Sequence, residues 1–449
     1  MESVEYIVSN IGMNSNASVT PSGGVRISKK LDTDVFIRGN IIKDDSLIRI
    51  STQLVDSHSG DVFKSFRVEA PANRHMDFKF IDDLSAQVKD YLVLSRKQKE
   101  LPDEQLNLAT TNNPEAYSNY AKGKYAFSKS DWPVAEEYFK LAIQLDQDFT
   151  FAHILLSWVY SNAGNIGKAI ETHQKVFVKK DSLPTYLSNK LMYQHAGYYD
   201  GPEMEIKYLK MLLESDDLDP FNHYDLGRAY TEMGNYDEAI NQYRKALEIY
   251  KRWGTKPFWV HNYLVLGYAY HETEQYGKER RIYKKAAKDF PGDIALLRSQ
   301  TILSFTLGKT GKGNKHLNEY KYLLKDRSFP EAYIMSAIAS IYMNSNMIEK
   351  AEENYRRVIK EYGQTPDRLN DLALFLIETE KDVEEGLGLV ETALEAEPEN
   401  PMYLATKGWG LFKQGHIGEA LQILKTAKDL NPIFDRRIYD YLQRIEETL

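Results

Sequence analysis

The 449-residue sequence contains no cysteine. A disulfide framework and thiolate chemistry are therefore excluded. The compartment stays open, because a chain without cysteine is compatible with a reducing or an oxidising space.

Long apolar runs are absent as well. No stretch reaches the roughly 18 apolar residues of a membrane span, and the amino-terminal residues lack the basic segment and apolar core of an export signal. We therefore expect no membrane span and no export signal in these residues. The localisation is unknown, and the chain is expected to be a soluble cytoplasmic or periplasmic portion of a protein that could be membrane-anchored.

Concentrated positive charge and reactive constellations are missing too. The net charge is −8 and no long basic run occurs, which argues against direct binding of nucleic acid. The ten histidines are scattered, and His261 and His271 lack the spacing of paired metal ligands. The run Gly308 to Lys315 has Leu303 where a phosphate loop needs its first glycine, so we expect a flexible turn between helices. We expect no metal, no cofactor and no catalysis.

The stretch from Pro220 to Leu247 contains one complete two-helix unit. Gly227 lies where the first helix must approach its partner closely, and Gly234 begins the turn. The second helix brings Ala239, Tyr243 and Ala246 to the same seam, where small residues let two backbones approach. This spacing resembles the tetratricopeptide repeat. The resemblance implies a right-handed α-solenoid that holds other proteins.

Similar units recur from residue 116 to residue 432, and we count about nine. Pro398 and Pro432 are 34 residues apart, which is one period of this repeat. The third unit is weak, with Met204 at the small-residue position of its second helix, and the fifth has Glu279 where alanine belongs. Each pair exposes an apolar face that only its neighbours can cover, so the units must stack. Residues 433–449 are expected to form a capping helix.

The first hundred residues show a different pattern. Residues 34–42, 47–55 and 62–69 read as three strands of a meander, and residues 77–96 have helical spacing. A shorter strand is expected at 4–9 and a short helix near 25–31. If an opening strand is missing, a partner or a second copy could pair with the exposed edge, giving a homodimer. Alternatively, the loop 10–24 covers that edge.

Residues 31–69 resemble the TolB-like (FlgO-like) amino-terminal domain of bacterial signalling proteins. The resemblance rests on Gly39, the run Gln53 to Asp56, Gly60 and the aromatic Phe63. It implies a partial α/β domain over 1–98, followed by a linker over 99–115 and the repeats over 116–432. In such proteins the repeats are joined to a protein kinase, a nucleotide cyclase or a DNA-binding domain. The fold class expected is therefore mainly α, with a small α/β domain in front.

Aromatic residues are plentiful, with 31 tyrosines, 18 phenylalanines and 5 tryptophans. In the tetratricopeptide family, positions 2, 5, 9 and 12 of each first helix line the concave groove. Such rings offer a large contact area at a small entropic cost. The alternative is that many of them pack between repeats. The predicted partner-binding residues are Tyr117, Tyr120, Lys124, Phe127, Phe151, Trp158, Tyr186, Tyr193, Phe221, Tyr224, Arg228 and Tyr268.

These observations predict a non-catalytic scaffold that binds a protein or peptide in the groove, as the sensory or partner-binding region of a bacterial signalling protein. Two alternatives remain. The chain could be part of a signalling enzyme or transcription regulator whose effector domain lies outside it, or it could be a small-molecule sensor.

Overall fold

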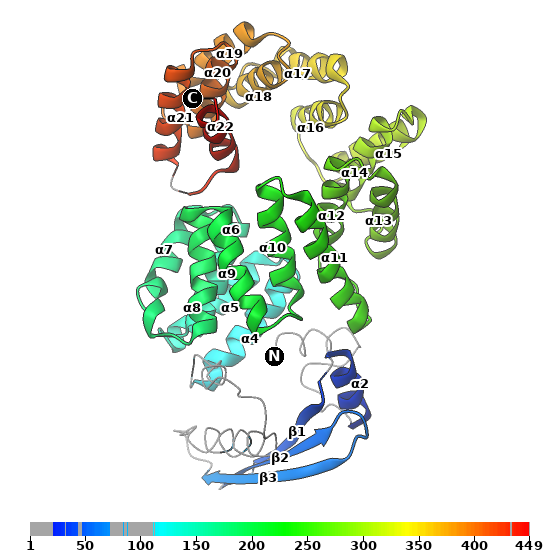
Figure 1. Ribbon diagram of the computed structural model, residues 1–449, viewed down its shortest axis with the longest axis vertical. Coiled ribbons are helices and arrows are strands. Elements are labelled where there is room, and N and C mark those ends of the chain that lie inside the picture. Colours follow the sequence, from blue (N-terminus) through cyan, green and yellow to red (C-terminus); the bar gives the residue numbers. More distant parts are fainter. Residues whose placement is uncertain are drawn as a thin grey trace. The chain divides into compact units, whose positions relative to one another are not determined.

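The computed structural model describes residues 21–31, 33–43, 47–71, 84, 88, 111, 113–431 and 433–448. They are mainly helical, with one small sheet near the amino terminus (Figure 1). The chain divides into two compact units. The first comprises Met1–Gln194, Tyr208–His223 and Lys245–Phe258, and the second comprises His195–Lys207, Tyr224–Arg244 and Trp259–Leu449.

The sheet has three antiparallel strands in the order β1-β2-β3. They are β1 (Val35–Lys43), β2 (Leu47–Asp56) and β3 (Val62–Pro71), as the sequence predicts. Gly39 pairs with Thr52, and a methyl group on Gly39 would lie 2.5 Å from the Ser51 carbonyl oxygen, so only glycine fits there.

Only part of the other amino-terminal elements can be compared with the expectation. Leu84 and Val88 are helical and buried against Leu54 of the sheet, in agreement with the predicted helix over 77–96. The rest of that segment, the expected strand at 4–9 and most of the linker lie outside the described residues. The TolB-like resemblance and the domain boundaries therefore stay predictions.

Helix α2 (Pro21–Leu31) packs against the end of a repeat helix within the first unit. Ile27 joins a buried cluster with Ile249, Tyr250 and Trp253. The Lys30 ammonium donates to the Trp253 carbonyl oxygen, at the carboxyl end of a helix where a cation is favoured. The loop predicted over 10–24 thus overlaps a helix that begins at residue 21.

From residue 114 on, the described helices follow one another as antiparallel pairs. Each pair has a first helix and a second helix, and nine such pairs precede a last single helix in this described part of the chain. The pairs are α4 (Pro114–Ser128) with α5 (Trp132–Leu145), α6 (Thr150–Asn162) with α7 (Ile166–Phe177), α8 (Thr185–His195) with α9 (Pro202–Ser215), α10 (Pro220–Glu232) with α11 (Tyr236–Trp253), α12 (His261–Glu272) with α13 (Tyr276–Asp289), α14 (Ile294–Thr306) with α15 (Thr310–Asp326), α16 (Glu331–Asn344) with α17 (Ile348–Tyr362), α18 (Pro366–Glu378) with α19 (Val383–Ala396) and α20 (Pro401–Lys413) with α21 (Ile417–Leu430), and α22 (Arg436–Glu446) is last.

In several pairs the seam follows the predicted small residues. A methyl group on Gly227 would lie 2.5 Å from the Tyr243 ring, and one on Gly267 would lie 2.1 Å from the Tyr283 ring. The ring of the second helix therefore occupies the space that the glycine leaves. This contact explains why an aromatic follows sixteen residues after the small residue in these units.

Two predictions inside the repeats are wrong. Most of the run Gly308 to Lys315 is helical, since α15 begins at Thr310 and Gly313 packs against the Phe305 ring. In the third unit the buried seam position of α9 is held by Glu205, not by Met204. The shift follows from a turn of π-helix, Ala196–Asp200, that extends α8 and moves the start of α9.

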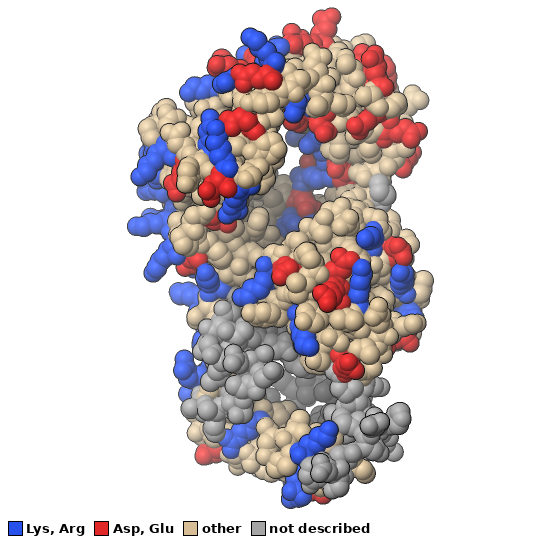
Figure 2. All heavy atoms as spheres, turned by 180° about the vertical axis from the view of Figure 1, so that it is seen from behind, with Lys and Arg blue, Asp and Glu red and all other residues tan. Residues whose placement is uncertain are grey.

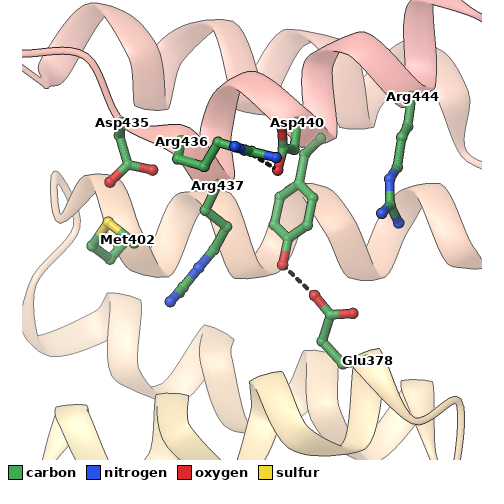
Figure 3. Close-up of a pocket in the computed structure, with 8 residues that line it drawn as sticks. Glu378, Met402, Asp435, Arg436, Arg437, Asp440 and Arg444 are labelled. Carbon is green, nitrogen blue, oxygen red and sulfur yellow. Dashed lines mark hydrogen bonds and ion pairs between the residues drawn. The ribbon is translucent and has the colours of Figure 1, made fainter. Parts of the chain in front are cut away.

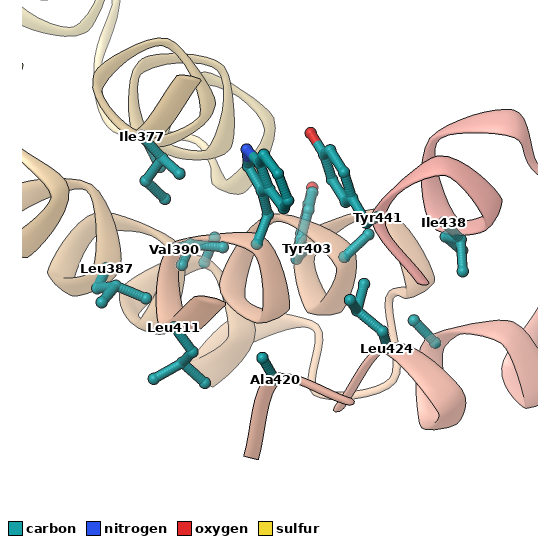
Figure 4. Close-up of a cluster of buried hydrophobic side chains, with 14 of the residues drawn as sticks. Ile377, Leu387, Val390, Tyr403, Leu411, Ala420, Leu424, Ile438 and Tyr441 are labelled. Atoms are coloured by element: carbon teal, nitrogen blue, oxygen red, sulfur yellow. The ribbon is translucent and has the colours of Figure 1, made fainter. Parts of the chain in front are cut away.

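The carboxyl-terminal repeats share one core. Buried residues of α18 to α22 form one apolar cluster (Figure 4). Within it the Trp409 ring stacks on Tyr441 at 4.4 Å, with the two planes 2° apart. Helix α22 buries Ile438, Tyr441 and Ile445 in this core. The predicted final helix is therefore present, and its apolar side is covered by the last repeat.

The segment that leads into α22 also contacts the third repeat within the second unit. The Phe434 amide donates to the Tyr198 carbonyl oxygen at 2.8 Å, and the Phe434 ring lies against Gly201. The Tyr439 hydroxyl donates to Glu203 Oε1 at 2.6 Å. More than two hundred residues separate these partners in the sequence, so the contacts depend on the stacking of the repeats between them.

Candidate functional site

The first-helix face is defined here by positions 2, 5, 9 and 12 of each first helix, counted so that the seam residue is position 8. In the first unit this face carries rings that touch one another. Tyr120 is 6% exposed and lies 4.9 Å from the Phe149 ring, whereas Tyr117, 6.0 Å from Tyr120, is exposed. Tyr120 therefore contributes mostly to the core, and Tyr117 offers more of its ring to a partner.

The neighbouring positions continue this aromatic row. The Trp158 and Tyr193 rings lie 6.2 Å apart, and the Lys190 ammonium lies 5.6 Å from both Trp158 and Tyr186. Tyr193 is only 6% exposed, while Trp158 is half-buried. The other predicted residues in this unit are half-buried: Lys124, Phe127, Phe151, Tyr186 and Phe221.

In the second unit the predicted residues are Tyr224, Arg228 and Tyr268. Tyr268 is 46% exposed and its ring meets Tyr236 edge-on at 6.2 Å. Tyr224 is half-buried, and desolvation raises the pKa of its hydroxyl to about 12. The predicted groove thus falls into two sets, one in each compact unit, and its role in binding stays a prediction.

Arg228 is held by two carboxylates rather than left open for a ligand. Its guanidinium donates to Glu205 at 2.5 Å and also pairs with Glu232 one turn along α10. Glu205 is 3% exposed, and burial raises the pKa of its carboxyl to about 7, although Arg228 opposes that shift. The sequence did not reveal this pair, because Glu205 is 23 residues from Arg228 and stands where most repeats have alanine.

The fifth repeat has a similar pair. Glu279, which is 1% exposed, lies 3.0 Å from His271 Nδ1. The hydrogen bond to Glu279 raises the pKa of His271, and burial raises the pKa of Glu279. His271 is thereby fixed by the seam and not presented as a metal ligand. Among the residues with described placement, no group of three His, Cys, Asp or Glu could hold a metal ion.

A pocket lies at the carboxyl-terminal end of the first-helix face, inside the second unit. It has a volume of about 430 Å³ (Figure 3). Its walls come from three successive first helices, α18, α20 and α22. The lining residues are Glu378, Met402, Asp435, Arg436, Arg437, Asp440, Tyr441 and Arg444.

The aromatic stack fixes the back of this pocket. The Tyr441 hydroxyl donates to Glu378 Oε1 at 2.6 Å (Figure 3). The Arg444 guanidinium lies 5.5 Å from the centre of the Trp409 ring. Glu378 and desolvation raise the pKa of Tyr441 strongly, so this hydroxyl stays a donor at neutral pH.

The sequence indicates this pocket only in part. When the 34-residue period is carried from the ninth unit into α22, positions 2, 5 and 9 are Arg436, Tyr439 and Gln443, and of these Arg436 lines the pocket. This second part of the first-helix face was not predicted, because α22 was expected to be only a cap and the predicted binding residues were chosen mainly for their aromatic rings.

Two segments match sequence models of a known family. Residues 220–290 match one model described as tetratricopeptide repeat, and residues 332–364 match another with the same description. These segments are tetratricopeptide repeats. The first covers the pairs α10–α11 and α12–α13, and the second covers most of α16–α17. No curated protein matches the chain.

Solved structures with tetratricopeptide repeats are similar at low identity. A tetratricopeptide repeat protein from Parabacteroides merdae is 16% identical with a TM-score of 0.36, covering 59% of this chain and 100% of that one. Yeast Tom70 is 15% identical, with a TM-score of 0.35 and coverage of 75% and 89%. YrrB, described as a tetratricopeptide repeat protein with an unusual peptide-binding site, is 16% identical with a TM-score of 0.26 and covers 44% and 97%.

Proposed function

We propose that this chain is a non-catalytic interaction protein whose first-helix face holds an extended peptide or a helix of a protein partner. Proteins of this repeat family generally mediate protein–protein interactions, and two segments of the chain match the family. The observation that carries the proposal is that the pocket is built from three successive first helices, so the hollow follows the face that repeats of this kind present to partners.

The surface chemistry supports a protein partner. Figure 2 shows Lys and Arg mixed with Asp and Glu over the helical repeats on one face of the molecule. Nucleic acid is bound by concentrated positive charge, whereas protein–protein interfaces usually have a polar rim. Among the described residues no helix is long and apolar enough to cross a membrane.

The wider assignment is also proposed. The amino-terminal residues 1–98 would form a TolB-like domain and the whole chain would be the partner-binding region of a bacterial signalling protein. The support is the three-stranded sheet in the predicted place and order, with Gly39 at a position where no side chain fits.

The test uses peptides selected from a displayed library on the full chain. Tyr117→Ala, Trp158→Ala and Tyr268→Ala should each weaken a selected peptide about tenfold if that ring is a contact centre. Tyr125→Ala is the matched control for Tyr117→Ala, because Tyr125 is an exposed ring on the same helix α4 but outside the first-helix face. No enrichment of any peptide, or equal affinity in all variants, would refute the proposal.

A further inference from the structure

The side chains of two arginines of α22, Arg437 and Arg444, make no hydrogen bond and no ion pair with any described residue. Arg437 lies within electrostatic range of Asp371 and Tyr441, and the Arg444 guanidinium stacks over the Trp409 ring. A stacked guanidinium keeps its N–H edge free for an acceptor. Both side chains line the pocket and point to the same side of α22 (Figure 3).

The acidic residues of the pocket are already engaged. Asp440 accepts from Arg436 at 2.6 Å, Asp435 accepts from the Ile438 amide at 3.1 Å, and Glu378 accepts from Tyr441. Among the charged residues that line the pocket, Arg437 and Arg444 are those whose side chains make no hydrogen bond with a described residue. Guanidinium groups bind carboxylates with charge-assisted hydrogen bonds, often two at a time.

The spacing of the two guanidinium groups selects a partner. Arg437 and Arg444 are seven residues apart on one helix, which places their backbones about 10 Å apart at 1.5 Å per residue. An extended segment in the polyproline II conformation rises about 3.1 Å per residue and has three residues per turn, so side chains three residues apart lie on the same side, separated by about 9 Å. Met402 lies in the pocket as an apolar and adaptable contact for the residues between.

We propose that this pocket binds an extended acidic segment of a protein partner, with two Asp or Glu residues three positions apart on Arg437 and Arg444. The inference rests on the proposed function and specifies its partner. The carboxylates come from side chains within the segment, so a free chain end is not required.

The experiment selects peptides from a random library on the full chain, in two arms. In one arm the peptides are flanked on both sides, and in the other they end in a free carboxylate. The expected result is enrichment of acidic pairs at spacing three in both arms. Enrichment only in the free-end arm, or at spacing seven as in a helix, would overturn the inference.

Substitutions then test the two arginines with one selected, fluorescently labelled peptide. Arg437→Gln and Arg444→Gln should each raise its Kd about tenfold, the size of one charge-assisted contact. Arg357→Gln, on α17 outside the pocket, makes the same charge change and should leave the Kd unchanged. Arg437→Gln removes no hydrogen bond among the described residues, so folding should persist, and circular dichroism checks it.

The outcomes separate the inference from the function on which it rests. If the selected peptides lack acidic pairs and bind the parent, Arg437→Gln and Arg444→Gln equally, the inference of an acidic segment is wrong, while peptide binding itself stands. If no peptide is selected, both fail. Inorganic phosphate is the probe for a small anion: tight phosphate binding that needs Arg437 and Arg444, without acidic enrichment, would also overturn the inference.

Discussion

The buried carboxyl of Glu205 should make folding depend on pH. Its pKa is raised to about 7 in the folded chain from 4.5 when exposed, so the folded state binds more protons than the unfolded state between these values. Stability must therefore fall as pH rises through this window. For a pKa of 4.5 in the unfolded state and about 7 in the folded state, the free energy of unfolding falls by about 2.5 kcal/mol between pH 5 and pH 8.

The perturbation is Glu205→Gln, which keeps the shape of the side chain and its hydrogen bond to Arg228 but cannot titrate. Urea-induced unfolding, followed by far-ultraviolet circular dichroism at pH 5 and pH 8, compares the variant with the parent. Another group titrates in the same window, since burial raises the pKa of Asp371 to about 6. The difference between the two proteins isolates Glu205, because Asp371 is common to both.

We expect the variant to lose about 2.5 kcal/mol less than the parent between pH 5 and pH 8. Arg228→Ala is the complementary change, since it leaves Glu205 buried without its cation and should cost about 3 kcal/mol at pH 8 and less at pH 5. Parallel pH profiles for the parent and Glu205→Gln would refute the reasoning about burial.

Two further predictions concern packing. Gly267→Ala should destabilise the chain by about 1–3 kcal/mol, because the new methyl group would meet the Tyr283 ring, whereas Gly277→Ala in open space on α13 should be neutral or slightly stabilising; thermal unfolding measures both. Equal melting temperatures would contradict this. Trp409→Leu should lower the free energy of unfolding by about 2 kcal/mol, because it removes the stack on Tyr441. Compared with the parent, amide hydrogen exchange should become faster in α22 and stay unchanged in α4. Unchanged protection of α22 would speak against the stack as its anchor.

The helical pairs could be predicted from the sequence because their signals are local. Gly227 and Tyr243 are sixteen residues apart, and both the turn and the seam follow from this short spacing. The three strands were found for the same reason, since alternation and turn residues are also local. The run Gly308 to Lys315 was misread because glycine and lysine suggest a turn, while the Phe305 ring requires a small residue there within a helix.

The candidate site could be predicted only in part. The partners of Glu205, Tyr439 and Arg444 come from other helices. Tyr439, for example, lies 236 residues after its partner Glu203. No periodic pattern carries such information. The pocket itself depends on α22 adding a further first helix to the array, which a compositional search for aromatic rings overlooks.

Residues 251–257 lie between the fourth and the fifth repeat unit, and the packing of α2 on the end of α11 assigns them a structural role. The first of these residues extend α11 to Trp253. Together with Ile249 and Tyr250, Trp253 packs against Ile27 of α2. A fragment that begins at the first repeat would expose this apolar patch to water, and we expect such a fragment to self-associate. Amino-terminal truncation should therefore reduce the solubility of the protein more than its binding to a partner.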